Sequence, residues 1–358
     1  MFYHEAGQFK TSYEADSQIL PIRQDRIGLA LTLVIAFVVL PMAGDDYWFS
    51  AILIPFLVFA LAALGLNTLT GYAGQLSLRA AAFMAVGAYA AYNFQPRALG
   101  ISPITSFLLG GLSAAGVGVI FGLPSLRIKG FYLAVATLAA QFFVAWALTK
   151  FPWQSNNSSS GVISAQKIDI LGWPVDTPMK KYLFVLCIVC VLALVAKNLV
   201  RSATGRAWMA VRDMDVLAEV IGIPLMHTKL LAFAVSSFYC GVAGMLYAFC
   251  YLGSVESDGF GLDLSFRILF MIIFGGVGSI LGSFLGSAFT LLLPIFLDNV
   301  LPPLATALHL PFTNTSVSHI QLMVFGSLII FFLIVEPNGL ARLWQIAKEK
   351  LRLCPFPH

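Results

Sequence analysis

Residues 201–229 read RSATGRAWMAVRDMDVLAEVIGIPLMHTK and form a charged interruption in a chain that is otherwise mostly apolar. The stretch is compatible with helix, because Ala, Leu, Met, Arg and Glu all have high helix propensity. Long uncharged runs lie before and after it. A charged loop of this length between apolar runs is expected to stay in water and to meet a partner there. Its charged residues are Arg201, Arg206, Arg212, Lys229, Asp213, Asp215 and Glu219.

The composition of the chain indicates a membrane protein. Of its 358 residues, 59% are hydrophobic and only 11% are charged, whereas about a quarter of the residues in soluble domains are charged. Long uncharged runs of this kind are typical of helices that cross a bilayer. The fold class predicted is therefore an all-α polytopic membrane protein. The basic residues form no stripe, so nucleic acid is not expected as a partner.

The uncharged runs are the candidate transmembrane helices, and one of them is too long for a single crossing. A crossing needs about 20 residues, whereas residues 267–297 span more than that and contain Gly275, Gly276, Gly278, Ser279 and Gly282. These glycines favour a break into two helices, although a re-entrant loop would satisfy the same pattern. The runs lie at residues 27–44, 47–69, 80–94, 104–126, 131–149, 182–196, 230–252, 267–297 and 319–335.

The distribution of Lys and Arg predicts the orientation. With the N-terminus inside and residues 267–297 split, six of the 21 basic residues fall outside and the other 15 inside, as the positive-inside rule expects. We therefore expect about ten transmembrane helices, with Gly-broken segments and with both termini in the cytoplasm. The expected parts are an N-terminal tail (1–26), a transmembrane domain (27–341) with an outer loop (150–181) and an inner loop (201–229), and an amphipathic cytoplasmic tail (342–358).

The runs and loops carry no recognisable chemistry of their own. No ionisable residue lies well inside an apolar run, which argues against a proton-driven carrier, although sodium could still bind to backbone carbonyl groups. The common nucleotide-binding, metalloprotease and hydrolase motifs are absent, and the five His residues are scattered. The sequence thus predicts no catalytic residue, no metal site, no cofactor and no enzyme. Such a protein either conducts passively or takes its energy from a partner.

Two glycine-rich breaks are the candidate substrate pathway. Helices that are interrupted in the membrane present free backbone N–H and C=O groups to a polar cargo, and the N-terminus of a half-helix favours a carboxylate. Close helix packing is the alternative explanation for any single glycine. The pathway residues predicted are Gly71, Gly74, Gln75, Ser77, Gly275, Gly276, Gly278 and Ser279.

Several motifs occur in the order found in one known family. Residues 71–83 (GYAGQLSLRAAAF), 210–223 (AVRDMDVLAEVIGI), 273–282 (IFGGVGSILG) and 336–340 (EPNGL) together resemble the LivM-like permease subunits of branched-chain amino acid ABC transporters. The resemblance covers about residues 47–345. Several motifs in order are more specific than any one of them.

The resemblance implies an importer of the bacterial inner membrane that works by alternating access. It implies three kinds of partner besides the lipid bilayer and the cargo: a second, related permease, two ATP-binding subunits, which hydrolyse ATP, and a periplasmic substrate-binding protein. The inner loop would then dock on an ATPase subunit through a helix over residues 206–220, ended by Gly222 and Pro224. The predicted coupling residues are Arg212, Asp213, Asp215, Glu219 and Gly222.

Two departures from the family pattern bear on the cargo. Arg79-Ala80 stands where many members have Gly-His, and Met214-Asp215 stands where Asn-Glu is common. Because Arg79 follows the first break, the cargo could differ from leucine, isoleucine or valine. An ABC permease for urea or short amides is one alternative. A passive channel or facilitator is another, and a membrane scaffold that transports nothing is a third.

Overall fold

The computed structural model of the chain describes residues 23–97, 102–125, 131–151, 153–154, 162–165, 168–170, 173–307 and 339–353, with scattered helical residues between 320 and 334. Most of the described residues are helical. The first part contains α2 (Arg23–Val34), the π-helix η1 (Ile35–Val39), α3 (Leu40–Ala43), the π-helix η2 (Trp48–Leu53), α4 (Ile54–Asn67), the π-helix η3 (Thr68–Tyr72), α5 (Ala80–Arg97), α6 (Pro103–Ser125) and α7 (Phe131–Lys150).

The second part begins with three two-residue strands and returns to helix. It contains β1 (Ile163–Ser164), β2 (Asp169–Ile170), β3 (Trp173–Pro174), α8 (Pro178–Arg201), α9 (Ala203–Asp213), α10 (Asp215–Val220), α11 (Leu225–Leu246), the π-helix η4 (Tyr247–Leu252), β4 (Ser254–Val255), the 3-10 helix η5 (Asp258–Phe260), α12 (Leu262–Gly275), α13 (Ile280–Ala307) and α15 (Gly339–Leu353). β1 pairs antiparallel with β4, and β2 pairs antiparallel with β3.

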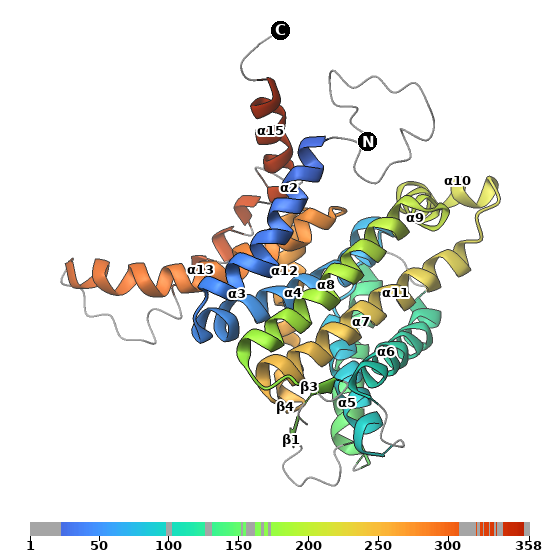
Figure 1. The fold of residues 1–358 in the computed structure, drawn as a ribbon. Helices are drawn as coiled ribbons and strands as arrows, with labels where there is room; N and C mark the ends of the chain where they lie inside the picture. Colours follow the sequence, from blue (N-terminus) through green and yellow to red (C-terminus); the bar gives the residue numbers. More distant parts are fainter. Residues whose placement is uncertain are drawn as a thin grey trace.

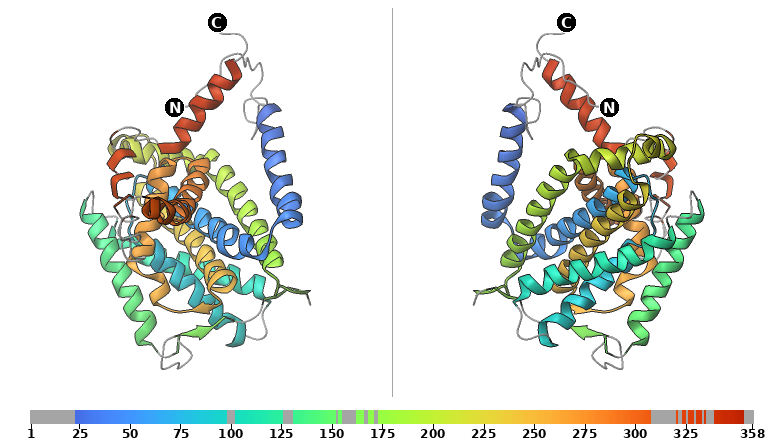
Figure 2. Two further views of the ribbon diagram at one scale, coloured as in Figure 1. Left: turned by 90° about the vertical axis from the view of Figure 1, so that its left-hand side faces the viewer. Right: turned by 90° about the vertical axis from the view of Figure 1, so that its right-hand side faces the viewer.

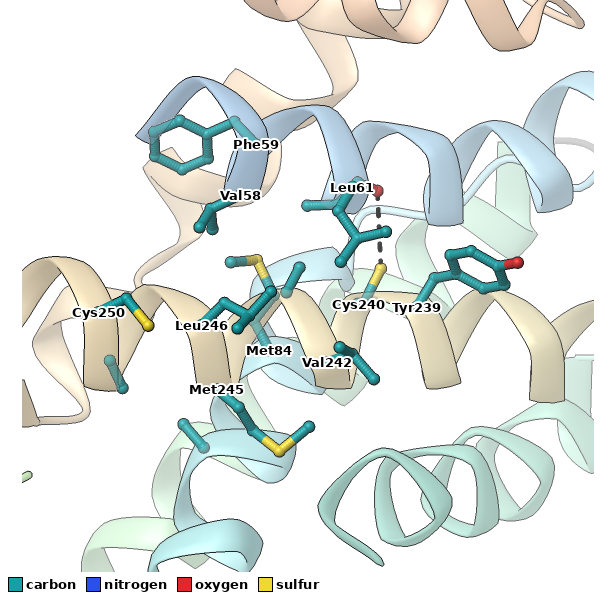
Figure 3. Packing of buried hydrophobic residues seen from close by; sticks show 14 of the residues in the cluster. Val58, Phe59, Leu61, Met84, Tyr239, Cys240, Val242, Met245, Leu246 and Cys250 are labelled. Atoms are coloured by element: carbon teal, nitrogen blue, oxygen red, sulfur yellow. Dashed lines mark hydrogen bonds between the residues drawn. The ribbon is translucent and has the colours of Figure 1, made fainter. Parts of the chain in front are cut away.

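Helix α11 packs against α4, α5 and α6 in the middle of the bundle (Figure 1). Small residues let these helices approach closely, as is usual between membrane helices: a Cβ on Gly241 would lie 2.5 Å from the Cβ of Ala114 on α6. Figure 3 shows the apolar contact between α4, α5 and α11, where the Cys240 thiol faces the Ala62 carbonyl oxygen at 3.9 Å. The core is thus made by helix packing, and Cys240 contributes to it as a small apolar residue.

Seven of the described helical segments are long and apolar enough to cross a membrane. The run at residues 182–196 is extended at both ends into α8, and the run at residues 80–94 becomes α5, which neighbouring helices bury. The prediction of an all-α polytopic protein is confirmed. Residues 1–22 and 354–358 of the predicted tails lie outside the described residues, as does much of the run at 319–335.

Both glycine-rich breaks interrupt helix where the sequence predicted. After η3 the chain is not helical from residue 73 to residue 79, and between α12 and α13 it is not helical from residue 276 to residue 279. Gly74, Gly276 and Gly278 adopt positive φ angles of 68°, 110° and 82°, a region that residues with a side chain rarely adopt. The long run at residues 267–297 is therefore two helices.

The two ends of the bundle differ. Figures 1 and 2 place α9, α10 and α15 toward one end and the short strands toward the other. Residues 339–353 form a helix, as the amphipathic pattern predicted. Its first residue, Gly339, lies against the second break, because a Cβ there would be 2.6 Å from the Gly276 nitrogen. The C-terminal helix is thereby attached to the α12–α13 turn.

The inner loop contains two helices where the sequence predicted one. The expected helix over residues 206–220 is interrupted at Met214, whose φ and ψ angles of −152° and 97° are extended. The i+3 spacing that would have brought Arg212 and Asp215 onto one helical face is therefore lost. The expected end of the helix is observed, since α10 stops at Val220 and Gly222 has a φ of +90°.

Candidate functional site

The two breaks meet at the side chain of Asn67, which is fully buried at the end of α4. Its Nδ2 donates to the Ser279 carbonyl oxygen at 2.8 Å and to Ser283 Oγ at 2.9 Å. Its Oδ1 accepts from the Gly278 N–H at 2.8 Å. One amide just before the first break therefore binds backbone groups of the second break, across more than 200 residues of sequence.

Arg212 connects the inner loop to the same junction. Its Nη1 donates to the Gly71 carbonyl oxygen at 2.9 Å, and its Nε pairs with Asp213 Oδ1, also at 2.9 Å. A Cβ on Gly74 would lie 2.7 Å from Arg212 Cγ. Residues predicted separately as pathway (Gly71, Gly74) and as coupling (Arg212) thus lie in one place, and the partly exposed Arg212 side chain reaches the first break from the loop.

A small apolar cluster holds α9 against the bundle. Trp208 is fully buried, and its Nε1 donates to the Thr228 carbonyl oxygen at 3.0 Å. It belongs to a cluster with Leu69 and Tyr72 of η3 and with Ala232 and Phe233 of α11. The position of α9 is thereby fixed relative to both the first break and α11, so the loop is more than a solvated connection.

A groove of about 640 Å³ opens between the first break and the inner loop. It collects predicted pathway residues and predicted coupling residues on one surface, whereas Glu219 and Gly222 are not among its lining residues. Lys229 contributes a positive charge, and Leu133 and Val220 contribute apolar walls. The lining residues are Ala73, Gly74, Gln75, Leu133, Val211, Arg212, Asp213, Met214, Asp215, Val216, Leu217, Val220 and Lys229.

The tip of the inner loop is apolar, which the sequence analysis missed. Five large hydrophobic side chains there are each more than half exposed. An apolar patch exposed at a loop tip is typical of a protein contact. The signal was present in the sequence as hydrophobic residues interleaved with the acidic ones. These residues are Met214, Val216, Leu217, Val220 and Ile221.

The start of α5 lies inside the bundle, and side chains from other helices satisfy its backbone donors. The Ala81 N–H donates to Ser265 Oγ at 3.0 Å, and the Ala82 N–H donates to Gln141 Oε1 at 2.8 Å. Just before the helix, the Leu78 N–H donates to Thr137 Oγ1 at 3.1 Å. The expectation of a free half-helix N-terminus for a carboxylate is therefore not met at Ala81 and Ala82.

Arg79 differs from its predicted placement. The orientation count assigned it to an inner segment in water, but its side chain is only 1% exposed. It lies between Phe83 of α5 and Phe233 of α11, with its Cζ 5.1 Å and 4.5 Å from the two ring centroids. The described part of the chain therefore does contain an ionisable side chain within the bundle.

Replacing Asn67 with leucine is expected to lower the stability of the junction. The change removes the acceptor of the Gly278 N–H, and it leaves the Ser279 carbonyl with its bonds from Ser283 alone. A polar group left without its partner costs about 1–3 kcal/mol when buried. The thermal midpoint of the purified chain in detergent should fall clearly. Asn93→Leu is the matched control: Asn93 is also buried but makes two hydrogen bonds through Nδ2 and none through Oδ1. A larger loss for Asn93→Leu would contradict the role given to Asn67.

Comparisons with known proteins agree with the motifs. Residues 48–333 match the family model described as "Branched-chain amino acid transport system / permease component". The chain is 27% identical over 307 residues to the high-affinity branched-chain amino acid transport system permease protein LivM of Escherichia coli (strain K12), covering 79% of this chain and 68% of the relative.

Two further relatives carry similar names. The LivM protein of Salmonella typhimurium is 28% identical over 306 residues, with the same coverage of 79% and 68%. A probable branched-chain amino acid transport permease protein LivM of Methanocaldococcus jannaschii is 27% identical over 240 residues, which is 66% of this chain and 67% of that protein. No solved structure matches the chain.

Proposed function

This chain belongs to the family of branched-chain amino acid transport system permease components, and on that premise we propose how it takes part in import. It is a multi-pass protein of the bacterial inner membrane and the permease of an ABC importer. We propose a branched-chain or similar amino acid as its cargo, following the names of its LivM relatives. The observation that carries the mechanism is the hydrogen bond from Arg212 to Gly71.

The proposed topology has ten crossings with both termini in the cytoplasm. Seven described segments are long and apolar enough to span, and we add α5, α12 and the run at residues 319–335. The break at residues 276–279 supports the split that this count needs. With this orientation, α9 and α10 face the cytoplasm, where an ATPase subunit can reach them.

The proposed coupling runs from the inner loop to the two breaks. An ATPase subunit that moves α10 also moves α9, because only Met214 lies between the two helices. Arg212 then shifts the Gly71 carbonyl, and Asn67 passes the displacement to Gly278 and Ser279. Because Asn67 fixes the two breaks to one another, they would move together. Alternating access requires such a joint movement of the segments that line a pathway.

The proposed partners are those of an ABC importer. The exposed apolar tip of α10 supports a docking surface for one of two ATP-binding subunits. A second, related permease and a periplasmic binding protein would complete the complex, the latter on the side of β1 and β4. We propose that ATP hydrolysis belongs to the partner subunits and that this chain has no catalytic residue.

The function is tested by reconstitution of the complex in liposomes. The chain with its second permease, two ATPase subunits and the binding protein should accumulate leucine only when ATP is supplied. The chain alone should move no solute. Flux through the purified chain without an ATPase would contradict the importer and would favour a passive channel.

Replacing Arg212 with alanine is expected to reduce coupled ATP hydrolysis. A hydrogen bond made by a charged group is worth about 1.5–3 kcal/mol, so the coupled rate should fall by about tenfold or more. Assembly should persist, because Trp208 still holds α9. Asp213→Asn is the control, since it removes an exposed ion pair worth about 1 kcal/mol or less and keeps the bond to Gly71. Equal losses in both variants would contradict the proposed link.

A further inference from the structure

The non-helical stretch at residues 73–79 carries a buried polar strip. Gln75, Ser77 and Arg79 are 8%, 2% and 1% exposed, whereas Leu76 between them is 40% exposed. The polar side chains therefore face the interior of the bundle, and Leu76 faces out. Gln75 also lines the groove at the inner loop, and Ser77 and Arg79 follow it at every second residue toward the start of α5.

Arg79 has unused hydrogen-bonding capacity at the deep end of this strip. Its Nη1 donates to the Phe121 carbonyl oxygen at 3.3 Å. Its Nε and Nη2 are buried and have no hydrogen-bond partner among the described residues. These two nitrogens lie on the same edge of the planar guanidinium, and that edge can hold a carboxylate through two parallel hydrogen bonds.

A packing role alone does not explain the choice of arginine at this position. The rings of Phe83 and Phe233 stabilise the cation, but an aliphatic side chain would fill the same space without the cost of burying a charge. Ionisable side chains inside membrane proteins usually mark the path of a substrate or an ion.

We propose that Arg79 binds the carboxylate of the cargo as it passes through the permease. This inference rests on the proposed function and adds a specificity-determining residue to it. The free Nε–Nη2 edge donates hydrogen bonds to two carboxylate oxygens, and the cargo then leaves toward the cytoplasmic groove past Ser77 and Gln75. A cargo that lacks the carboxylate, such as a carboxamide, loses both charge-assisted bonds.

The test compares a carboxylate cargo with its carboxamide. The complete complex is reconstituted with wild-type chain or Arg79→Met, and ATP-dependent accumulation of leucine and of leucinamide is measured at saturating binding protein. Loss of two bonds to a charged group should lower the leucine rate by about tenfold to a hundredfold, while the leucinamide rate stays within about twofold. Arg267→Met is the matched control, because Arg267 also lies over a phenyl ring, 5.7 Å from the Phe59 centroid, but is exposed.

The outcomes separate this inference from the proposed function. If wild-type complex accumulates no amino acid, the function itself fails. Suppose that wild-type complex imports leucine, and that Arg79→Met lowers the leucine and leucinamide rates equally or lowers neither of them. Arg79 is then only structural, and the inference is overturned. If the Arg79→Met complex does not assemble, Arg79→Lys is measured instead, because it keeps the charge but loses the bidentate edge. The leucine rate should then fall more, relative to wild type, than the leucinamide rate. Equal relative losses for the two cargoes would overturn the inference.

A lipid headgroup is the other source of an anion, and the lipid composition distinguishes it. The rates are measured in liposomes of phosphatidylcholine alone and in liposomes with added phosphatidylglycerol. If Arg79 binds the carboxylate of the cargo, Arg79→Met should lower the leucine rate selectively in both kinds of liposome. If the effect of Arg79→Met appears only with phosphatidylglycerol, the occupant is lipid and the assignment to cargo is wrong.

Discussion

Replacing Gly71 with leucine is expected to abolish uptake and to destabilise the folded chain. A Cβ at this position would overlap the backbone nitrogen and Cα of Gly278 and the Oδ1 of Asn67. Because two of these atoms are backbone, they cannot rotate away as a flexible side chain could. The two breaks must separate, and the hydrogen bond from the Gly278 N–H to Asn67 is lost. Overpacking and the unpaired groups together should cost about 3 kcal/mol or more.

The measurements for this variant are leucine accumulation in the reconstituted complex and the thermal midpoint in detergent. Gly71→Ala should fall between wild type and Gly71→Leu in both. The control is Gly116→Leu on α6, where a Cβ would meet no atom within 4 Å. A Gly71→Leu variant that takes up leucine at the wild-type rate would show that the junction of the two breaks is not needed for transport.

The helices and their breaks could be predicted because both signals are local. Uncharged runs of sufficient length indicate crossings, and clusters such as residues 275–278 interrupt them at a place that the sequence shows directly. The interruption at Met214 had no such signal, since neither glycine nor proline stands there. Met214 takes extended angles in a stretch with good helix propensity, so local preference does not set its conformation. The neighbouring helix α9 is held against the bundle by Trp208.

The connections within the site could not be predicted, because they join residues far apart in sequence. Arg212 binds a backbone carbonyl 141 residues earlier, and every residue presents such a group, so the side-chain types give no pairing. Asn67 was passed over as one polar residue at the end of an apolar run. Arg79 was counted as a loop charge because it borders a run, and only the packing of α5, α6 and α11 shows that it is buried.

Replacing Leu217 and Val220 together with aspartate is expected to separate the permease from its ATPase subunits. These side chains are 55% and 78% exposed at the tip of the inner loop, and an apolar anchor at a protein interface is commonly worth about 2 kcal/mol or more. Losing two such anchors should weaken the association by about a thousandfold. Co-purification of the ATPase subunits with the tagged permease should be lost, and leucine accumulation with it.

The fold of the double variant should be kept, because neither side chain belongs to a core cluster among the described residues. Ala203→Asp is the matched control: it adds negative charge to the same loop at the exposed first turn of α9, where the helix N-terminus favours it. The alternative explanation for the exposed apolar tip is that it holds the loop at the membrane surface. In that case the ATPase subunits would still co-purify with the double variant, and the tip could not be the docking surface.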